Sequence, residues 1–434
     1  MIEESGLMVG SISHKKFNIS KLIVVLIMFL GVFMPCLIRV RMQYVVISLE
    51  LITILFMLIF NRKLTFNRIT IKVFGAFIPF LLYYSISIIL NGLTSTNSLR
   101  AYLDEYTQII FVFLYAFVSI IFIQKWIQTS NEGFDGFSNL MTVVATIQLI
   151  CVMLAFMFPQ VKTFFNNLTI QNSLSEVIVN VTNNKWRMSY RAYGLAENLY
   201  DRFGYAISIL ISLSFLKGIS TNNRKKIALS LAMLMMPLLN ARTGLLLSGV
   251  GIVIIMFNYF KPKRVFSYLA IVIALIVSFA LVFNHLPTRL QLALTNGVDA
   301  TRGLLGGNGK TDVYLEIFEN DIVIPQNILF GAGLSPERKM GYSGIDSGYI
   351  QCLWRYGIIG TLLLLGGYAY SFILAVRYRN TKERKVLIIV ILTIFFTYLF
   401  KLFSLVNYGN VFLLFVILGA LISNKTDNQI DNTV

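Results

Sequence analysis

The chain of 434 residues is 56% hydrophobic and only 13% charged, and its mean hydropathy is +0.73. Soluble domains carry about a quarter charged residues because their surface must be solvated. These proportions exclude a soluble protein and predict an integral membrane protein. The formal charge of +17 would suit nucleic-acid binding, but the basic residues form short clusters between apolar runs, as in proteins that fix their membrane topology this way. We therefore expect no nucleic-acid partner.

Twelve apolar segments are candidates for membrane helices, which need roughly 20 mostly apolar residues. In chain order they span about 21–38, 44–60, 71–90, 106–124, 140–158, 203–217, 227–240, 243–259, 265–284, 348–376, 386–402 and 406–423. Abundant Phe (35) and scarce Pro (8) favour unbroken helices over a β-barrel, so the predicted fold is all-α and polytopic. The seventh and eighth segments are separated only by residues 240–242, which fits either a tight hairpin or one broken element.

Lysine and arginine in the short loops predict the orientation of these helices, because such residues concentrate on the cytoplasmic side. With the N-terminus inside, the inner segments carry most of them: Lys15, Lys16, Lys21, Arg62, Lys63, Arg68, Lys72, Lys125, Lys217, Arg224, Lys225, Lys226, Lys261, Lys263, Arg264, Arg377, Arg379, Lys382, Arg384, Lys385 and Lys425. The short outer loops carry only Arg39, Arg41, Arg100, Arg242 and Lys401. Both termini are therefore expected in the cytoplasm, with the apolar run from Leu22 kept as an anchor because no cleavage site follows it.

The predicted organisation has seven parts. They are a cytoplasmic tail (1–20), helices one to five (21–158), a long outer loop (159–202), helices six to nine (203–284), a second long outer loop (285–347), helices ten to twelve (348–423) and a cytoplasmic tail (424–434). Loops this long are usually functional. Their basic residues are mostly arginine, namely Arg187, Arg191, Arg202, Arg289, Arg302 and Arg338. Arginine is preferred over lysine where phosphate or carboxylate is bound through two parallel hydrogen bonds.

The first long loop ends in a dense mixture of basic, aromatic and acidic residues over 185–202. One interpretation is a site for an anionic, sugar-bearing ligand, in which arginine binds phosphate, aromatic rings bind sugar faces, and Glu197 or Asp201 is a general base. The other interpretation is an interfacial belt of Trp, Tyr and Arg that anchors the next helix. The sequence weighs these two evenly.

Two arginines are expected at membrane depth. Arg242 lies between two apolar runs, and Arg355 lies about two turns into a predicted helix. Charges there are costly and usually functional. An alternative interpretation of Arg242 is that its side chain extends to the lipid headgroups, and we favour the functional interpretation over it. Arg355 should need an anionic partner.

The second long loop holds a glycine-rich segment, 301–311, that resembles a phosphate-binding P-loop. The spacing is wrong, because Leu304 stands where that motif needs glycine, so we expect a flexible turn before an amphipathic helix over about 311–321. Asp346 suits the N-cap of the helix that follows, which does not exclude a catalytic role. The cysteines and histidines show no metal-binding spacing, and no cofactor is expected.

Taken together, five short motifs resemble those of a known family. They are Arg191-x-x-Gly194 with Glu197-Asn198, Ala241-Arg242-Thr243-Gly244, Phe330-Gly331-Ala332-Gly333, Asp346-Ser347-Gly348-Tyr349-Ile350, and Tyr356-Gly357-Ile358-Ile359-Gly360. In order and predicted side they are similar to the Wzy-type O-antigen and capsular polysaccharide polymerases, relatives of the O-antigen ligases. The resemblance covers roughly residues 185–365 and the layout of many helices with two long outer loops.

The resemblance implies a membrane glycosyltransferase of GT-C-like architecture in the bacterial cytoplasmic membrane. It would join oligosaccharide repeat units, each carried on undecaprenyl diphosphate, at the outer face, without a nucleotide sugar. A flippase and a separate chain-length regulator would be further partners. The residues expected to hold the diphosphate and substrate are Arg187, Arg191, Arg202, Arg242, Arg302, Lys310, Arg355 and Tyr193. The candidate bases are Glu197, Asp201 and Asp346.

Two positions depart from the family pattern. Asp346-Ser347 stands where the ligases tend to carry His-Asn, which favours a polymerase and leaves the base open. Gly309-Lys310 stands where relatives often have Gly-Arg, so Lys310 would hold phosphate as a point charge. A lipid-linked oligosaccharide flippase and an O-antigen ligase are the alternatives. The flippase is disfavoured because the ionisable residues concentrate in outer loops and no internal repeat is visible.

Overall fold

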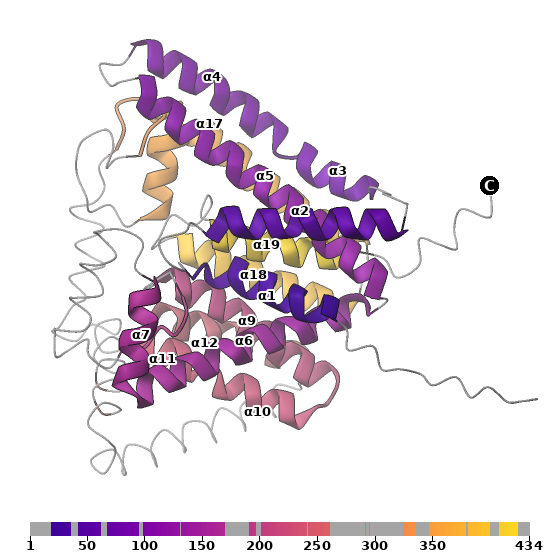
Figure 1. Ribbon diagram of the computed structural model, residues 1–434. Helices are drawn as coiled ribbons and strands as arrows, with labels where there is room; N and C mark the ends of the chain where they lie inside the picture. The colour runs from indigo at the N-terminus through magenta and orange to yellow at the C-terminus, as the bar shows by residue number, and fades with distance from the viewer. Residues whose placement is uncertain are drawn as a thin grey trace, which may run out of the picture.

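The computed structural model describes residues 19–35, 42–61, 67–94, 99–130, 132–169, 191–196, 201–240, 242–260, 324–335, 347–378, 381–399 and 408–423, with the single positions 291 and 295. Throughout these residues the secondary structure is helical, apart from turns and short extended segments. The helices form one elongated bundle (Figure 1). They are α1 (Ile19–Phe33), α2 (Met42–Asn61), α3 (Arg68–Gly75), α4 (Ile78–Thr94), α5 (Leu99–Ser130), α6 (Gly133–Met157), α7 (Pro159–Thr169), α9 (Asp201–Ser220), α10 (Arg224–Ala232), α11 (Met235–Asn240), α12 (Arg242–Tyr259), α17 (Gly348–Tyr378), α18 (Lys382–Leu399) and α19 (Tyr408–Ile422).

The all-α, multi-pass prediction agrees with these helices. Within the described residues, five spans are long and apolar enough to cross a membrane: Arg68–Leu93, Leu99–Gln128, Gly133–Met157, Arg202–Ser220 and Gly348–Tyr378. Shorter apolar helices coincide with four further predicted segments, at Lys21–Phe33, Met42–Phe56, Thr243–Tyr259 and Tyr408–Ile422. The predicted segment 265–284 lies outside the described residues, as does the predicted amphipathic helix 311–321.

The structure resolves the ambiguity at residues 240–242 in favour of a hairpin. The chain runs toward residue 240 through two short helices, α10 and α11. The helix is broken between them because Pro237, in the first turn of α11, lacks the N–H that a continuous helix needs. At the far end Gly244 of α12 lies against the start of α9, since a Cβ at Gly244 would sit 2.5 Å from the Cα of Gly204. At its other end α12 reaches the start of α18, where the ammonium of Lys382 lies 4.7 Å from the ring centre of Tyr259. The two halves therefore run in opposite directions.

Three ion pairs among the described residues lie at the end of the bundle that is distant from the segments 191–196 and 324–335, and we call this end the opposite end. Lys217, near the end of α9, contacts the carboxylates of Asp135 at the start of α6 and, at 3.7 Å, Glu383 at the start of α18. Lys21 of α1 contacts Glu132 at 2.8 Å, just before α6. All five residues belong to segments that the sequence assigns to a single side of the membrane.

The other end, which we call the loop end, carries the segments 191–196 and 324–335. Figure 1 shows α7 and the beginning of α17 toward this end, away from α3 and α10. One ring contact and one hydrogen bond show which helix ends are neighbours here. The ring centres of Tyr205, near the start of α9, and Tyr398, near the end of α18, are 4.9 Å apart. The hydroxyl of Tyr349, at the start of α17, donates to the carbonyl of Phe396 at 3.1 Å. The starts of α9 and α17 thus flank the last turns of α18.

The first long loop does not begin as loop. Its first eleven residues form α7, which starts at Pro159 directly after α6 and packs on that helix. Proline suits the first turn of a helix because its missing N–H would have no partner there. The predicted boundary at 158/159 is therefore a turn between two helices.

Candidate functional site

The segment 191–196 is held at the loop end by side chains from two helices. Asn240, the last residue of α11, accepts a hydrogen bond from the backbone N–H of Ala192 at 2.8 Å and donates one to its carbonyl at 2.7 Å. Gln148 of α6 donates to the carbonyl of Tyr193 at 2.7 Å. Gly194, with φ +61°, lies against Cys151 of α6. The backbone on both sides of Arg191 and Tyr193 is therefore fixed relative to the bundle.

Arg191 itself is half-buried, and its Nη1 donates to the hydroxyl of Tyr193 at 3.2 Å. The ring of Tyr193 is 3% exposed and packs edge-on against Phe203 of α9, with the ring centres 5.9 Å apart. Its ring faces are thus occupied by protein, and its hydroxyl is turned to the guanidinium. Asn240 also brings the start of α12, at Arg242, next to this segment. The first two motifs of the resemblance are therefore neighbours in space.

The third motif docks on the fifth. The helix α17 is interrupted at Gly357, which has φ 64° and ψ −174°. The freed backbone groups bond to the segment before Leu334: the N–H of Ile358 donates to the carbonyl of Ile328 at 2.9 Å, and the N–H of Ala332 donates to the carbonyl of Trp354 at 2.6 Å. In a membrane protein, unpaired backbone groups are costly, so a helix break needs such partners. The glycine-rich segment 328–333 supplies them.

Glycine is required on both sides of this contact. Gly331 and Gly357 both have positive φ, and a Cβ on Gly357 would lie 2.5 Å from the backbone nitrogen of Gly331. Tyr83 of α4 completes the junction, because the single proton of its hydroxyl is shared between the carbonyl of Tyr356 at 2.9 Å and that of Phe330 at 3.2 Å. This arrangement explains why two glycine motifs more than twenty residues apart occur together.

We expect Gly357→Ala to detach the segment 328–333 from α17. The substitution adds a methyl group inside the contact distance of Gly331 and places a side chain at φ 64°, ψ −174°, a region that only glycine adopts readily and that alone costs about 1–3 kcal/mol. The measurement is the rate of proteolytic cleavage within 324–335 in the purified protein, together with its melting temperature. Gly249→Ala is the matched control, since a Cβ at Gly249 would meet nothing within 4 Å. Equal cleavage rates in the two variants would contradict the packing described.

Two turns into α17, Arg355 forms an ion pair with Glu105 of α5. The Nη1–Oε1 distance is 3.1 Å, and the two side chains are only 14% and 3% exposed. The anionic partner that the sequence predicted for Arg355 is therefore present within the chain. Burial of both charges is favourable only when their pairing is well satisfied. Arg355 is consequently held in one place at the loop end.

A group of buried tyrosines from α4, α5 and α17 includes the residue that follows Arg355. Tyr356, the next residue in α17, packs edge-on against Tyr84 of α4 with ring centres 5.1 Å apart. The hydroxyl of Tyr84 donates to the carbonyl of Gly333 at 3.3 Å, and a Cβ on Gly333 would lie 3.2 Å from the ring of Tyr102. The glycine-rich segment is thus also packed on α4 and α5. All three rings are fully buried, so they pack the segment onto the helices and do not face a ligand.

The structure describes only some of the predicted site residues. Arg191, Tyr193 and Arg355 lie as given above. Asp201 is the first residue of α9 and Arg242 the first of α12, while Arg202 follows Asp201 with an exposed side chain. The others lie outside the described residues, and their assignments stay predictions: Arg187, Glu197, Arg302, Lys310 and Asp346. Among the residues that are described, no three His, Cys, Asp or Glu side chains gather closely enough to hold a metal ion.

Sequence reasoning missed Glu105. The predicted fourth helix began at 106, which placed Glu105 in a short loop, whereas α5 begins at Leu99. The available signal was the pattern over 99–106, where Tyr102 and Tyr106 recur at helical spacing around Glu105. An earlier helix start would have put this carboxylate at membrane depth, where an ionisable residue is a functional candidate.

A scan of the sequence against protein-family models finds no match, and a search of curated proteins finds none either.

Proposed function

We propose that the protein is a polysaccharide polymerase that joins undecaprenyl-diphosphate-linked oligosaccharide repeat units at the outer face of the bacterial cytoplasmic membrane. The product would be O-antigen, capsule or exopolysaccharide. The observation that carries the proposal is that the described motif segments, 191–196, 242–244, 330–333 and 347–360, all lie at the loop end of one helical bundle. Two of their arginines, Arg191 and Arg355, are each positioned by a phenol or carboxylate of the same chain.

The chemistry needs three groups that this end could offer. The donor sugar leaves a lipid diphosphate, on which negative charge develops, and preorganised guanidinium groups stabilise such charge. The acceptor hydroxyl needs a base, for which Glu197, Asp201 and Asp346 are candidates. The isoprenoid chain needs an apolar path. Exposed apolar side chains next to the Gly357 junction, including Phe330 (48% exposed) and Leu362 (64% exposed), would provide one.

The proposed orientation places the loop end outside and both termini in the cytoplasm. It is supported by the positions of the lysines that predicted it. Lys21, Lys217 and Lys382 all lie at the opposite end, with Asp135 and Glu383 as partners of Lys217. Cytoplasmic segments are enriched in lysine and arginine.

A flippase and an O-antigen ligase are the alternatives. A flippase should carry ionisable residues along a central path. A ligase would move finished glycan to another acceptor, and Asp346-Ser347 does not match its usual His-Asn step.

A glycan profile of a strain lacking this gene separates the three functions. A polymerase deletion should leave single repeat units attached to the normal acceptor and remove all long chains. Loss of every displayed repeat would indicate the flippase instead, and accumulation of lipid-linked polymer would indicate the ligase. Either of these two results would overturn the proposal.

A further inference from the structure

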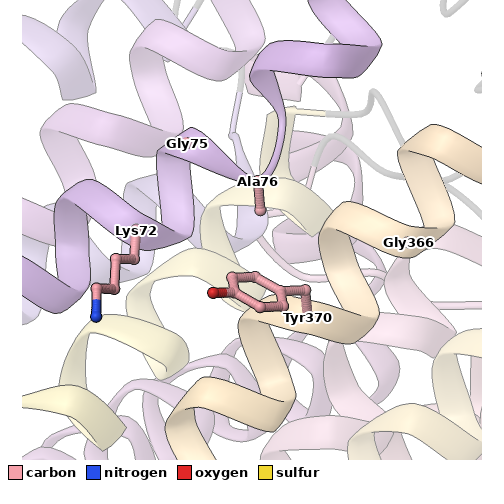
Figure 2. Close-up of a pocket in the computed structure, with 5 residues that line it drawn as sticks. All are labelled: Lys72, Gly75, Ala76, Gly366 and Tyr370. Carbon is pink, nitrogen blue, oxygen red and sulfur yellow. The ribbon is translucent and has the colours of Figure 1, made fainter.

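A groove lies at the side of the bundle where α3 gives way to α4. It is lined by Lys72, Gly75, Ala76, Gly366 and Tyr370, and its volume is about 350 Å³. Figure 2 shows the ring of Tyr370 on α17 beneath Ala76, with its hydroxyl turned to the side on which Lys72 lies. The groove is open because the first helix of the span stops at Gly75 and the second starts at Ile78.

Two glycines keep the groove unfilled. A Cβ at Gly75 or at Gly366 would meet nothing within 4 Å. One lies on each wall, so the slot between α3 and α17 has a smooth apolar lining with an aromatic floor. The side chain of Tyr370 is 45% exposed, and Ile373, three residues on, is 48% exposed. A slot of this kind accepts a flexible hydrocarbon chain.

Basic side chains are found at the headgroup level of this groove. Lys72 is exposed and lines it, and Arg68 is exposed one turn earlier in α3. Arg377, seven residues beyond Tyr370, is exposed and returns to the same face of α17. The residues that line the groove include no acidic side chain. The local charge is therefore positive and suits an anionic group.

The groove opens near the opposite end of the bundle, away from the candidate site. The side-chain amide of Asn67, which caps α3, donates to the carbonyl of Ile422 at the end of α19. Thr70 donates to Gln124 near the end of α5. Both partners are at the ends of helices whose starts belong to the loop end. In the proposed orientation this level is that of the cytoplasmic leaflet, where anionic lipids attract basic residues.

We propose that this groove binds one anionic phospholipid, with an acyl chain between Gly75 and Gly366 and the phosphate near Lys72. Basic pockets between membrane helices are a known means of holding such headgroups. The hydroxyl of Tyr370 can add a hydrogen bond to a lipid oxygen. The lipid would cover the break between α3 and α4 and so support the wall of the bundle next to α17.

Native mass spectrometry of the purified full-length protein tests this proposal. Phosphatidylglycerol and phosphatidylcholine with identical acyl chains are added in separate experiments, and the fraction of protein that retains one lipid is measured. We expect the wild type to retain phosphatidylglycerol several-fold more than phosphatidylcholine. Lys72→Gln should remove most of that preference, and Gly366→Leu should lower retention of both lipids by filling the slot.

Lys225→Gln is the matched control, since Lys225 is an exposed lysine on α10, outside the groove. It should behave as the wild type. The melting temperature of every variant is measured in the same detergent, so that loss of fold is detected. Equal retention of the two lipids by the wild type would overturn the proposal, as would an equal loss of preference in Lys72→Gln and Lys225→Gln. Tight protein dimers displaced by Gly366→Leu, without retained lipid, would show that a second copy fills the groove.

Discussion

Replacing Arg191 with alanine is expected to abolish glycan polymerisation while the protein still inserts into the membrane. The side chain is positioned by the Tyr193 hydroxyl at 3.2 Å, on a backbone fixed by Asn240 and Gln148. Removing one preorganised donor to a developing negative charge typically costs about 10²–10³ in rate. Arg242→Ala should have the same effect. The measurement is the ladder of glycan chain lengths in a deletion strain that carries each variant.

Arg191→Lys should also lose most activity if the guanidinium binds phosphate through two hydrogen bonds, because an ammonium is a point charge. Arg224→Ala is the control, an exposed arginine at the start of α10 that should leave the ladder unchanged. Long chains in the Arg191→Ala strain, at normal levels of membrane protein, would refute the role assigned to this residue.

The second large effect is expected from the Glu105–Arg355 pair. Arg355→Met leaves a 3% exposed carboxylate without this ion pair, and loss of one partner of a buried pair typically costs about 3–5 kcal/mol. Glu105→Leu should be similarly destabilising. Together the two substitutions should cost less than either alone, because no buried charge is stranded. The free energy of unfolding in detergent, measured for all four proteins, gives the coupling.

Activity separates a structural role of this pair from a functional one. If Arg355 binds substrate, the double variant should recover much of the stability but none of the polymerisation. Recovery of both would mean that the pair only holds α5 to α17. Stabilities that simply add, with no coupling between the two positions, would contradict the contact itself.

Much of the fold could be predicted from sequence because membrane helices are encoded locally. Apolar runs alone identified α2, α6, α12 and α19, and the basic loops grouped the residues found at the opposite end. Boundaries were harder, since polar residues continue into helices at the membrane surface. The clearest cases are α5 and α6, which start at Leu99 and Gly133, each seven residues before the predicted start.

The candidate site was predicted only in part, because its contacts are not local. Arg355 was expected to need an anion, but nothing in the sequence names Glu105, which is 250 residues away. The glycines at 331 and 357 were recognised as motifs, yet their mutual contact depends on a break in α17 that the apolar pattern does not reveal. Tyr193 shows the reverse case, a predicted ligand-binding ring whose faces are covered by protein.

The most direct test of the proposed function is reconstitution. The purified protein is placed in liposomes with an undecaprenyl-diphosphate-linked repeat unit from its own host, without nucleotide sugars or other enzymes. We predict glycan chains of more than one repeat and release of undecaprenyl diphosphate, with neither product in the Arg191→Ala variant. Transport of the intact lipid-linked unit across the bilayer, with no chain longer than one repeat, would contradict the polymerase and indicate the flippase.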